Sequence, residues 1–172
     1  MNLKKSIVNF ICTSGDKLKP VILKILPLNT AKKLKAKLIH SAYNENTLKK
    51  PFEKDFYPFG INYVAYIRAQ MGLGQGGRLI AKAIEKSGMP FLIIDTKVGN
   101  PFNHNDMSWE YKIKKSPEYS INIYHINPEQ MPPLQLSLPS DMSHKRYNIG
   151  IWLWELPDFP DEWCGAFSLV DE

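Results

Sequence analysis

The sequence INYVAYIRAQMGLGQGGRLIAKAIEKSGMPFLIID, residues 61–95, decides the fold. Its first part, INYVAYI, is β-branched, aromatic and nearly all apolar, which is typical of a strand covered on both faces. The apolar residues from Leu79 to Ile84 have helical spacing, and Gly88 suits the left-handed position that ends a helix. Its last part, FLIID, repeats the buried-strand pattern. The stretch predicts a βαβ unit with parallel strands and a right-handed crossover.

A glycine-rich turn lies between the first strand and the helix. Glycines allow a tight turn and let a ligand phosphate approach the backbone N–H groups, and the helix behind them presents the positive end of its dipole. The alternative is that the glycines only permit close packing of helix on strand, and we favour the anion-facing role. The predicted binding residues of this turn are Gly72, Gly74, Gln75, Gly76, Gly77 and Arg78, the last as a bidentate anion donor.

Two further strands are predicted, at 120–126 and 147–155. Pro160, followed by Asp161 and Glu162, predicts the start of a helix. Together these elements indicate an α/β fold, a Rossmann-like and mostly parallel sheet flanked by helices.

Ligands of open α/β sheets bind beyond the carboxyl ends of the strands. That rule places Asn127, Glu129 and Gln130, which follow the third strand, on the same rim as the glycine turn. The neighbouring His125 is either a core histidine or a group that points into the crevice. The predicted segment 97–119 between the second and third strands is a long connection with at most a short helical piece.

The end of the fourth predicted strand carries Glu155 and two tryptophans, Trp152 and Trp154. A carboxylate there can accept hydrogen bonds from sugar hydroxyls, and an indole can offer its face to a pyranose ring. The alternative makes the tryptophans core residues and Glu155 a capping or solvated group. His104 and Asp106 suggest metal ligands, but no further ligands stand at suitable spacing, so we predict a surface loop and no metal site.

The charge of the chain is divided unevenly. Residues 1–50 hold eleven lysines against Asp16 and Glu45, a formal charge of +9, whereas residues 51–172 carry −4. We therefore divide the chain into a basic, partly helical leader, 1–59, with a helix predicted at 30–39, and a domain, 60–172. The leader either lies on an anionic membrane surface or docks on the domain through its leucines, and both alternatives stay open. Nucleic acid is not expected, because the leader lacks arginine.

No apolar run approaches the roughly 20 residues that span a bilayer, and the N-terminus has no signal-peptide pattern. We expect a cytoplasmic protein, with a peripheral position at the inner membrane face as the membrane alternative.

The pattern Gly72-x-Gly74-x-x-Gly77 also fits the dinucleotide fingerprint, with Asp95 where a ribose-binding acid would lie. This favours an NAD(P)-dependent oxidoreductase as an alternative function. Two features oppose it: residues 68–71 separate the strand from the first glycine, and nothing downstream resembles a hydride-transfer site.

Three segments, 60–69, 72–78 and 147–163, resemble the N-terminal half of bacterial glycosyltransferases with the GT-B fold, in the retaining glycosyltransferase family four. The tryptophan-rich segment is the most specific part of the likeness, which does not extend with the same specificity to the leader. The resemblance implies transfer of a sugar from a nucleotide-diphosphate sugar to a saccharide or lipid-linked acceptor, as in polysaccharide biosynthesis, with the acceptor held by this domain. It implies no tightly bound cofactor.

In such enzymes the first glycine-rich loop approaches the donor diphosphate, and a later residue, for which His125 and Asn127 are candidates, faces the donor sugar. Glu155 is a third catalytic candidate. The nucleotide-binding C-terminal domain is not among these residues, so we expect a fragment that is inactive alone, with an exposed sheet edge. A third hypothesis is a non-catalytic module that pairs with a separate chain.

Overall fold

The computed structural model describes residues 27, 30, 33, 37, 51–155 and 157–172. Thr30, Lys33 and Lys37 are helical and exposed, in agreement with the predicted helix at 30–39. The other residues of the predicted helix, and the other residues among 1–50 except Pro27, lie outside the described residues.

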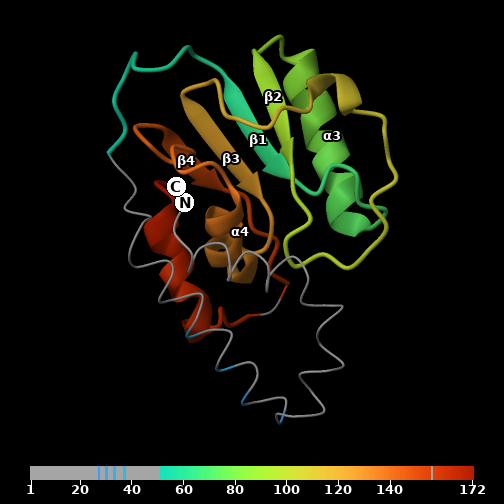
Figure 1. The fold of residues 1–172 in the computed structure, drawn as a ribbon, viewed down its shortest axis with the longest axis vertical. Helices are drawn as coiled ribbons and strands as arrows, with labels where there is room; N and C mark the ends of the chain where they lie inside the picture. The colour runs from blue at the N-terminus through green and yellow to red at the C-terminus, as the bar shows by residue number, and fades with distance from the viewer. Residues whose placement is uncertain (1–26, 28–29, 31–32, 34–36, 38–50, 156) are drawn as a thin grey trace.

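Four parallel strands form one sheet, in the order β2-β1-β3-β4 (Figure 1). The strands are β1 Ile61–Ala65, β2 Phe91–Asp95, β3 Ile121–His125 and β4 Tyr147–Gly150. The helical elements are α3 Gly72–Lys86, η1 Glu110–Lys112, η2 Pro128–Gln130, α4 Met131–Ser137 and η3 Asp161–Leu169, the three η elements being 3-10 helices. The prediction of a Rossmann-like, parallel α/β fold is confirmed.

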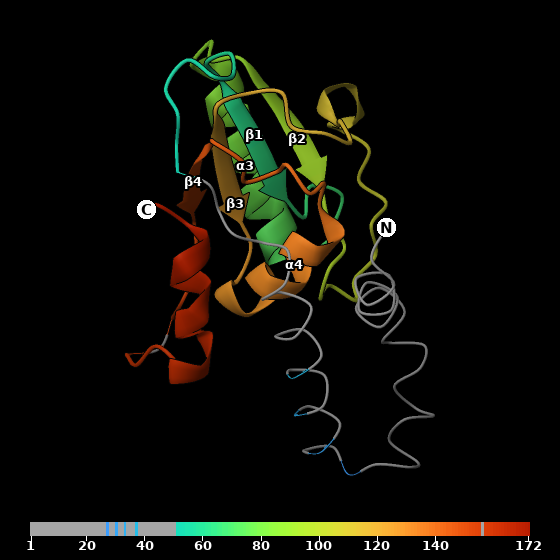
Figure 2. The same ribbon diagram turned by 60° about the vertical axis from the view of Figure 1, so that its left-hand side comes forward.

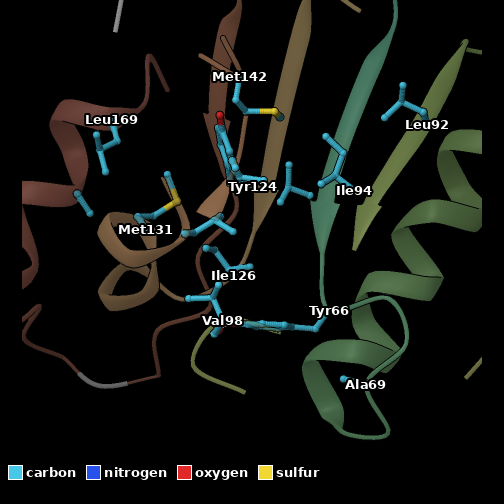
Figure 3. Close-up of a cluster of buried hydrophobic side chains, with 14 residues drawn as sticks. Tyr66, Ala69, Leu92, Ile94, Val98, Tyr124, Ile126, Met131, Met142 and Leu169 are labelled. Atoms are coloured by element: carbon cyan, nitrogen blue, oxygen red, sulfur yellow. Dashed lines mark hydrogen bonds between the residues drawn. The ribbon is translucent and has the colours of Figure 1, made fainter. Parts of the chain in front are cut away.

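Alternate residues of the strands face two separate cores. Tyr63 and Ala65 of β1 face α3, where they pack with Ala81 and Trp109. Val64, between them, faces the opposite side, where α4 and η3 supply Met131, Leu134, Ala166 and Leu169 (Figures 2 and 3). Covering both faces of the sheet explains why the strands read as nearly continuous apolar runs.

The glycine cluster is helical, which corrects the prediction of a turn. Helix α3 begins at Gly72, so the turn between β1 and α3 consists of residues 66–71 instead. Gly88 has φ +73°, the left-handed conformation expected after the helix. None of the helices in the described part of the chain is long and apolar enough to cross a membrane.

The proline-rich segment after β3 ends the strand, as predicted, but then becomes helical, which the sequence interpretation missed. Pro128 starts η2, and Pro132 and Pro133 lie at the start of α4. The first turn of a helix tolerates proline because its N–H groups have no intrahelical acceptor.

The fourth strand ends at Gly150, five residues before its predicted end at Glu155. The Trp152 indole packs so closely on Gly150 that a Cβ there would lie 2.8 Å from the ring. The prediction of an exposed sheet edge does not hold on the β4 side: Gly150 N–H donates to the Glu172 carbonyl (2.8 Å), and Asp171 N–H donates to the Asn148 carbonyl (2.6 Å).

A buried asparagine ladder joins three strands. Asn62, Asn122 and Asn148 stand in register on β1, β3 and β4, and none of the three is exposed to solvent. The Asn62 amide donates to Asn122 Oδ1 (2.8 Å), and the Asn122 amide donates to Asn148 Oδ1 (2.9 Å). The ladder also holds a loop, because Asn62 Oδ1 accepts the backbone N–H groups of Glu118 and Tyr119.

We predict that Asn122→Ala lowers the free energy of unfolding by about 3 kcal/mol, because it removes one hydrogen bond each from the buried Asn62 amide, Asn148 Oδ1 and the Met142 carbonyl. Urea unfolding followed by circular dichroism measures the change. Asn105→Ala, in an exposed loop, is the control and should change stability by less than about 0.5 kcal/mol. Equal effects at the two positions would contradict a stabilising role of the ladder.

Candidate functional site

A crevice opens at the point where the strand order reverses. The chain leaves β1 toward β2 on one side and returns across β1 to β3 on the other, so the loops after β1 and β3 diverge between these two strands. A solvent-open cleft of about 330 Å³ lies at this position. It is lined by Tyr66, Met71, Leu73, Gly99, Asn100, Pro101, Phe102, Asn127, Glu129 and Gln130.

The predicted rim residues Asn127, Glu129 and Gln130 all line this cleft, so the sequence placed them correctly. Asn127 Oδ1 and Glu129 Oε2 are buried and have no hydrogen-bond partner among the described residues. Because a buried acceptor without a partner is costly, these two oxygens indicate a place where a ligand would donate hydrogen bonds. The lining contains no lysine or arginine.

Helix α3 begins at the cleft, through Met71 and Leu73. The N-cap residue is Met71, whose side chain makes no capping hydrogen bond, so the first N–H groups of the helix remain available as donors. Tyr66 closes the floor by donating its hydroxyl hydrogen to the Val98 carbonyl (2.6 Å; Figure 3). Burial, and secondarily the charge of Glu129, raise the pKa of the Tyr66 phenol, so it stays a donor.

Three of the predicted phosphate-facing glycines lie against the strands or the β1–α3 turn, but only Gly74 lacks room for a side chain. A Cβ on Gly74 would lie 2.0 Å from the Ala69 carbonyl oxygen, and one on Gly76 would lie 3.4 Å from the His125 ring. A Cβ on Gly77 would touch Ala65 at 3.5 Å. Gly72 has open space around it, and none of these glycines lines the cleft. Their contact with a ligand remains a prediction, whereas the close approach of α3 to the sheet is observed.

Arg78 fastens the β1–α3 turn. Its Nη1 donates to the carbonyls of Ile67 and Ala69 (both 2.9 Å), and its Nε lies 3.2 Å from Asp106 Oδ2. Gln75, exposed on the helix, accepts from Nη2 at 3.1 Å. The guanidinium that was predicted to meet an anion is therefore occupied by the protein itself.

His125 is a core residue in this structure. Only 2% of it is exposed, and its Nδ1 lies 2.7 Å from the Tyr63 hydroxyl, beneath α3. Desolvation lowers the pKa of the imidazole, which favours the neutral form. Of the two alternatives for this histidine, the buried position agrees with the core one.

Glu155 and Trp154 lie apart from the cleft lining. Glu155 is exposed in the extended segment beyond β4 and not at the strand's end. The Trp154 indole N–H donates to the Asp158 carbonyl (2.9 Å), and the ring packs edge-on against Trp163. Trp152 packs against the core, which agrees with the core alternative, whereas Trp154 belongs to an aromatic cluster outside the two cores.

Asp95, the predicted ribose-binding acid of a dinucleotide site, is bonded to Arg68 of the same chain. Its Oδ1 accepts the backbone N–H of Arg68 and its Oδ2 pairs with the guanidinium, both at 3.3 Å. Burial raises the pKa of this carboxyl more than Arg68 lowers it.

In the described residues no three of the His, Cys, Asp and Glu side chains come together as a metal site. Asp106 is engaged by Ser108 and Arg78.

The sequence interpretation missed the part of the cleft that follows β2. Gly99 has φ +69°, and a Cβ there would collide with the Gln130 amide, so the two loops are in close contact. Asn100 and Phe102 continue this wall. The signal was present, because a glycine and an asparagine just beyond a parallel strand lie on the rim where ligands bind.

No protein-family model, no curated protein and no solved structure matches this chain. The fold and the site by themselves define the class: a Rossmann-like α/β domain with a crevice at the point where its strand order reverses.

We predict that Gly74→Ala lowers the free energy of unfolding by at least about 2 kcal/mol, because the new methyl group collides with backbone that cannot move aside. Gly72→Ala, in open space at the start of the same helix, is the matched control. It should leave stability unchanged or raise it by up to about 1 kcal/mol. Similar midpoints for the two variants in urea unfolding would exclude the packing role of Gly74.

The lowered pKa of His125 predicts acid sensitivity. Below pH 6.5, the ordinary pKa of histidine, the His125 imidazole binds a proton in the unfolded chain but stays neutral in the folded protein. Stability should therefore fall, by at most about 1.4 kcal/mol per pH unit, as the pH drops from 6.5 toward the folded pKa. Urea unfolding of the wild type and of His125→Asn over this range measures the slope. The same slope in both proteins would assign it to other groups.

Proposed function

We propose that residues 60–172 are the acceptor-side half of a glycosyltransferase, and that the cleft between the β1 and β3 loops holds a sugar ring. The observation that carries the proposal is the pair of buried, unpartnered oxygens, Asn127 Oδ1 and Glu129 Oε2, in the crevice where α/β sheets bind ligands. In this proposal the donor is a nucleotide-diphosphate sugar and transfer proceeds with retention.

A saccharide suits the chemistry of the lining. Its hydroxyl groups are donors for the free carboxylate and amide oxygens, and its apolar ring face can pack on Leu73 and Phe102.

The proposal assigns the sugar and the diphosphate to different places. Glu129 would repel a phosphate deep in the cleft, since no lysine or arginine of the lining compensates its charge. The N-terminus of α3, with uncapped N–H groups beside Leu73, is the part of the rim that favours an anion. A second, nucleotide-binding domain would supply the remaining donor contacts, and the domain alone would be inactive.

The oxidoreductase alternative is less favoured, because Asp95, its ribose-binding acid, is already paired with Arg68. The third hypothesis, a non-catalytic module that pairs with a separate chain, stays a prediction from the sequence. So does a cytoplasmic location, with or without peripheral membrane contact.

Titration followed by ¹H–¹⁵N NMR tests the proposal with three probes: methyl α-D-glucopyranoside, UDP-glucose and NADH. The sugar and UDP-glucose should shift the amide signals of Leu73, Asn127 and Gln130, around the cleft. Shifts with NADH alone would favour the hypothesis of an NAD(P)-dependent oxidoreductase over that of a glycosyltransferase. No shift at these residues with either sugar probe would overturn the proposed site.

We predict that Glu129→Gln weakens sugar binding about tenfold, because a neutral amide oxygen is a poorer acceptor than a carboxylate. The same change should improve binding of glucuronate, whose own carboxylate no longer meets a negative charge. Glu118→Gln, an exposed carboxylate outside the cleft, is the control and should change neither affinity. The dissociation constants come from the NMR titrations, and equal effects on the neutral and anionic sugars would contradict a direct contact with Glu129.

A further inference from the structure

The C-terminal segment after β4 is strongly acidic. Residues 151–172 contain no lysine or arginine. Their six carboxylates, all exposed, are Glu155, Asp158, Asp161, Glu162, Asp171 and Glu172. In the described part of the chain, Glu155, Asp158, Asp161 and Glu162 form no salt bridge. We call the surface of residues 151–172 the acidic aromatic surface.

Apolar groups accompany these carboxylates. Leu153 and Phe167 are each 53% exposed. Phe167 belongs to a continuous group of rings, with centroid distances of 5.3 Å from Phe167 to Phe159 and 6.1 Å from Phe159 to Trp163. Exposed apolar side chains surrounded by charges of one sign are typical of a surface that is covered by an amphipathic, oppositely charged partner.

The chain itself contains such a partner. Residues 1–50 carry a formal charge of +9, and their lysines alternate with apolar residues such as Leu34 and Leu38. This segment joins the described domain beside the acidic aromatic surface. Phe52 packs edge-on against Tyr147 at 5.7 Å, and the Tyr147 hydroxyl donates to Glu172 Oε2 at 3.3 Å.

The junction is also held firmly. The Lys145 ammonium pairs with Glu53 at 2.5 Å, and the Arg146 guanidinium stacks on Tyr57 at 3.6 Å from the ring centroid. A segment tethered this close experiences an effective concentration of its target on the order of millimolar. Opposite charges within a Debye length of about 8 Å then attract without strong screening.

We propose that residues 1–50 dock on the acidic aromatic surface of the same chain, lysines against carboxylates and leucines against Leu153 and Phe167. In the membrane alternative, the same lysines contact lipid, so docking and membrane binding compete for them.

The acidic aromatic surface is close to the cleft, because η3 packs against η2, which carries Glu129.

Zero-length carbodiimide cross-linking of the full chain, mapped by mass spectrometry, tests the docking. Low protein concentration should give intramolecular links between leader lysines and carboxylates of residues 155–172, and these links should weaken with salt. The double variant D161K/E162K should reduce them about fivefold, since like charges then face the leader. The control E85K/E118K changes charge equally at exposed positions outside this surface and should leave the links intact.

Vesicles of phosphatidylserine and phosphatidylcholine give a second, independent measurement. If docking holds the lysines, D161K/E162K releases them and increases flotation with the vesicles relative to E85K/E118K. Equal flotation of both variants and of the wild type would overturn the proposal. So would cross-links only between two copies of the chain, which would assign the surface to a second molecule, or links that fall elsewhere on the domain.

Discussion

The asparagine ladder across β1, β3 and β4 is the constraint on which the other features depend. Each amide both donates and accepts, so a shift of one strand by a residue would leave several buried polar groups unpaired. The register of β1, β3 and β4 relative to one another is thereby set. The same ladder anchors the chain's end, because Asn148 binds the Asp171 carboxylate through its backbone and side chain. The register of three strands, the loop at residues 118–119 and the C-terminal residues therefore all depend on this one row of side chains.

Helix α3 shows how packing shapes the candidate site. Gly74 allows the helix to lie directly on the Ala69 carbonyl, while Gly76 and Gly77 make ordinary contacts with His125 and Ala65. The uncapped start of this helix lies at the cleft. The phosphate-facing role proposed for these glycines and the packing role are thus linked, since the second positions the helix for the first. Arg78 completes the arrangement by holding the β1–α3 turn through its carbonyls. The protein's own groups use this arginine, and the cleft is left with acceptors that suit a sugar.

Much of the fold was predictable from the sequence. The apolar runs gave the first three strands to within a residue or two, and Gly88 marked the end of the helix correctly. Asn127, Glu129 and Gln130 were also placed on the rim, because the carboxyl ends of parallel strands share one edge. The repeated motif of an asparagine in second place in β1, β3 and β4 was a further signal for the ladder that was not used.

What the sequence determined by itself is the parallel α/β layout, since the period and length of apolar runs depend on burial alone. The contacts of individual polar groups were decided only by tertiary structure. From the sequence, Arg78 and Trp154 could equally contact a ligand or another part of the protein. In the structure each donates a hydrogen bond to a nearby backbone carbonyl. The Trp152 indole packs on Gly150, where β4 ends. The opposite charges of the leader and the tail matter only because Phe52 and Glu172 both contact Tyr147. Such outcomes depend on residues distant in the chain, and no local pattern contains them.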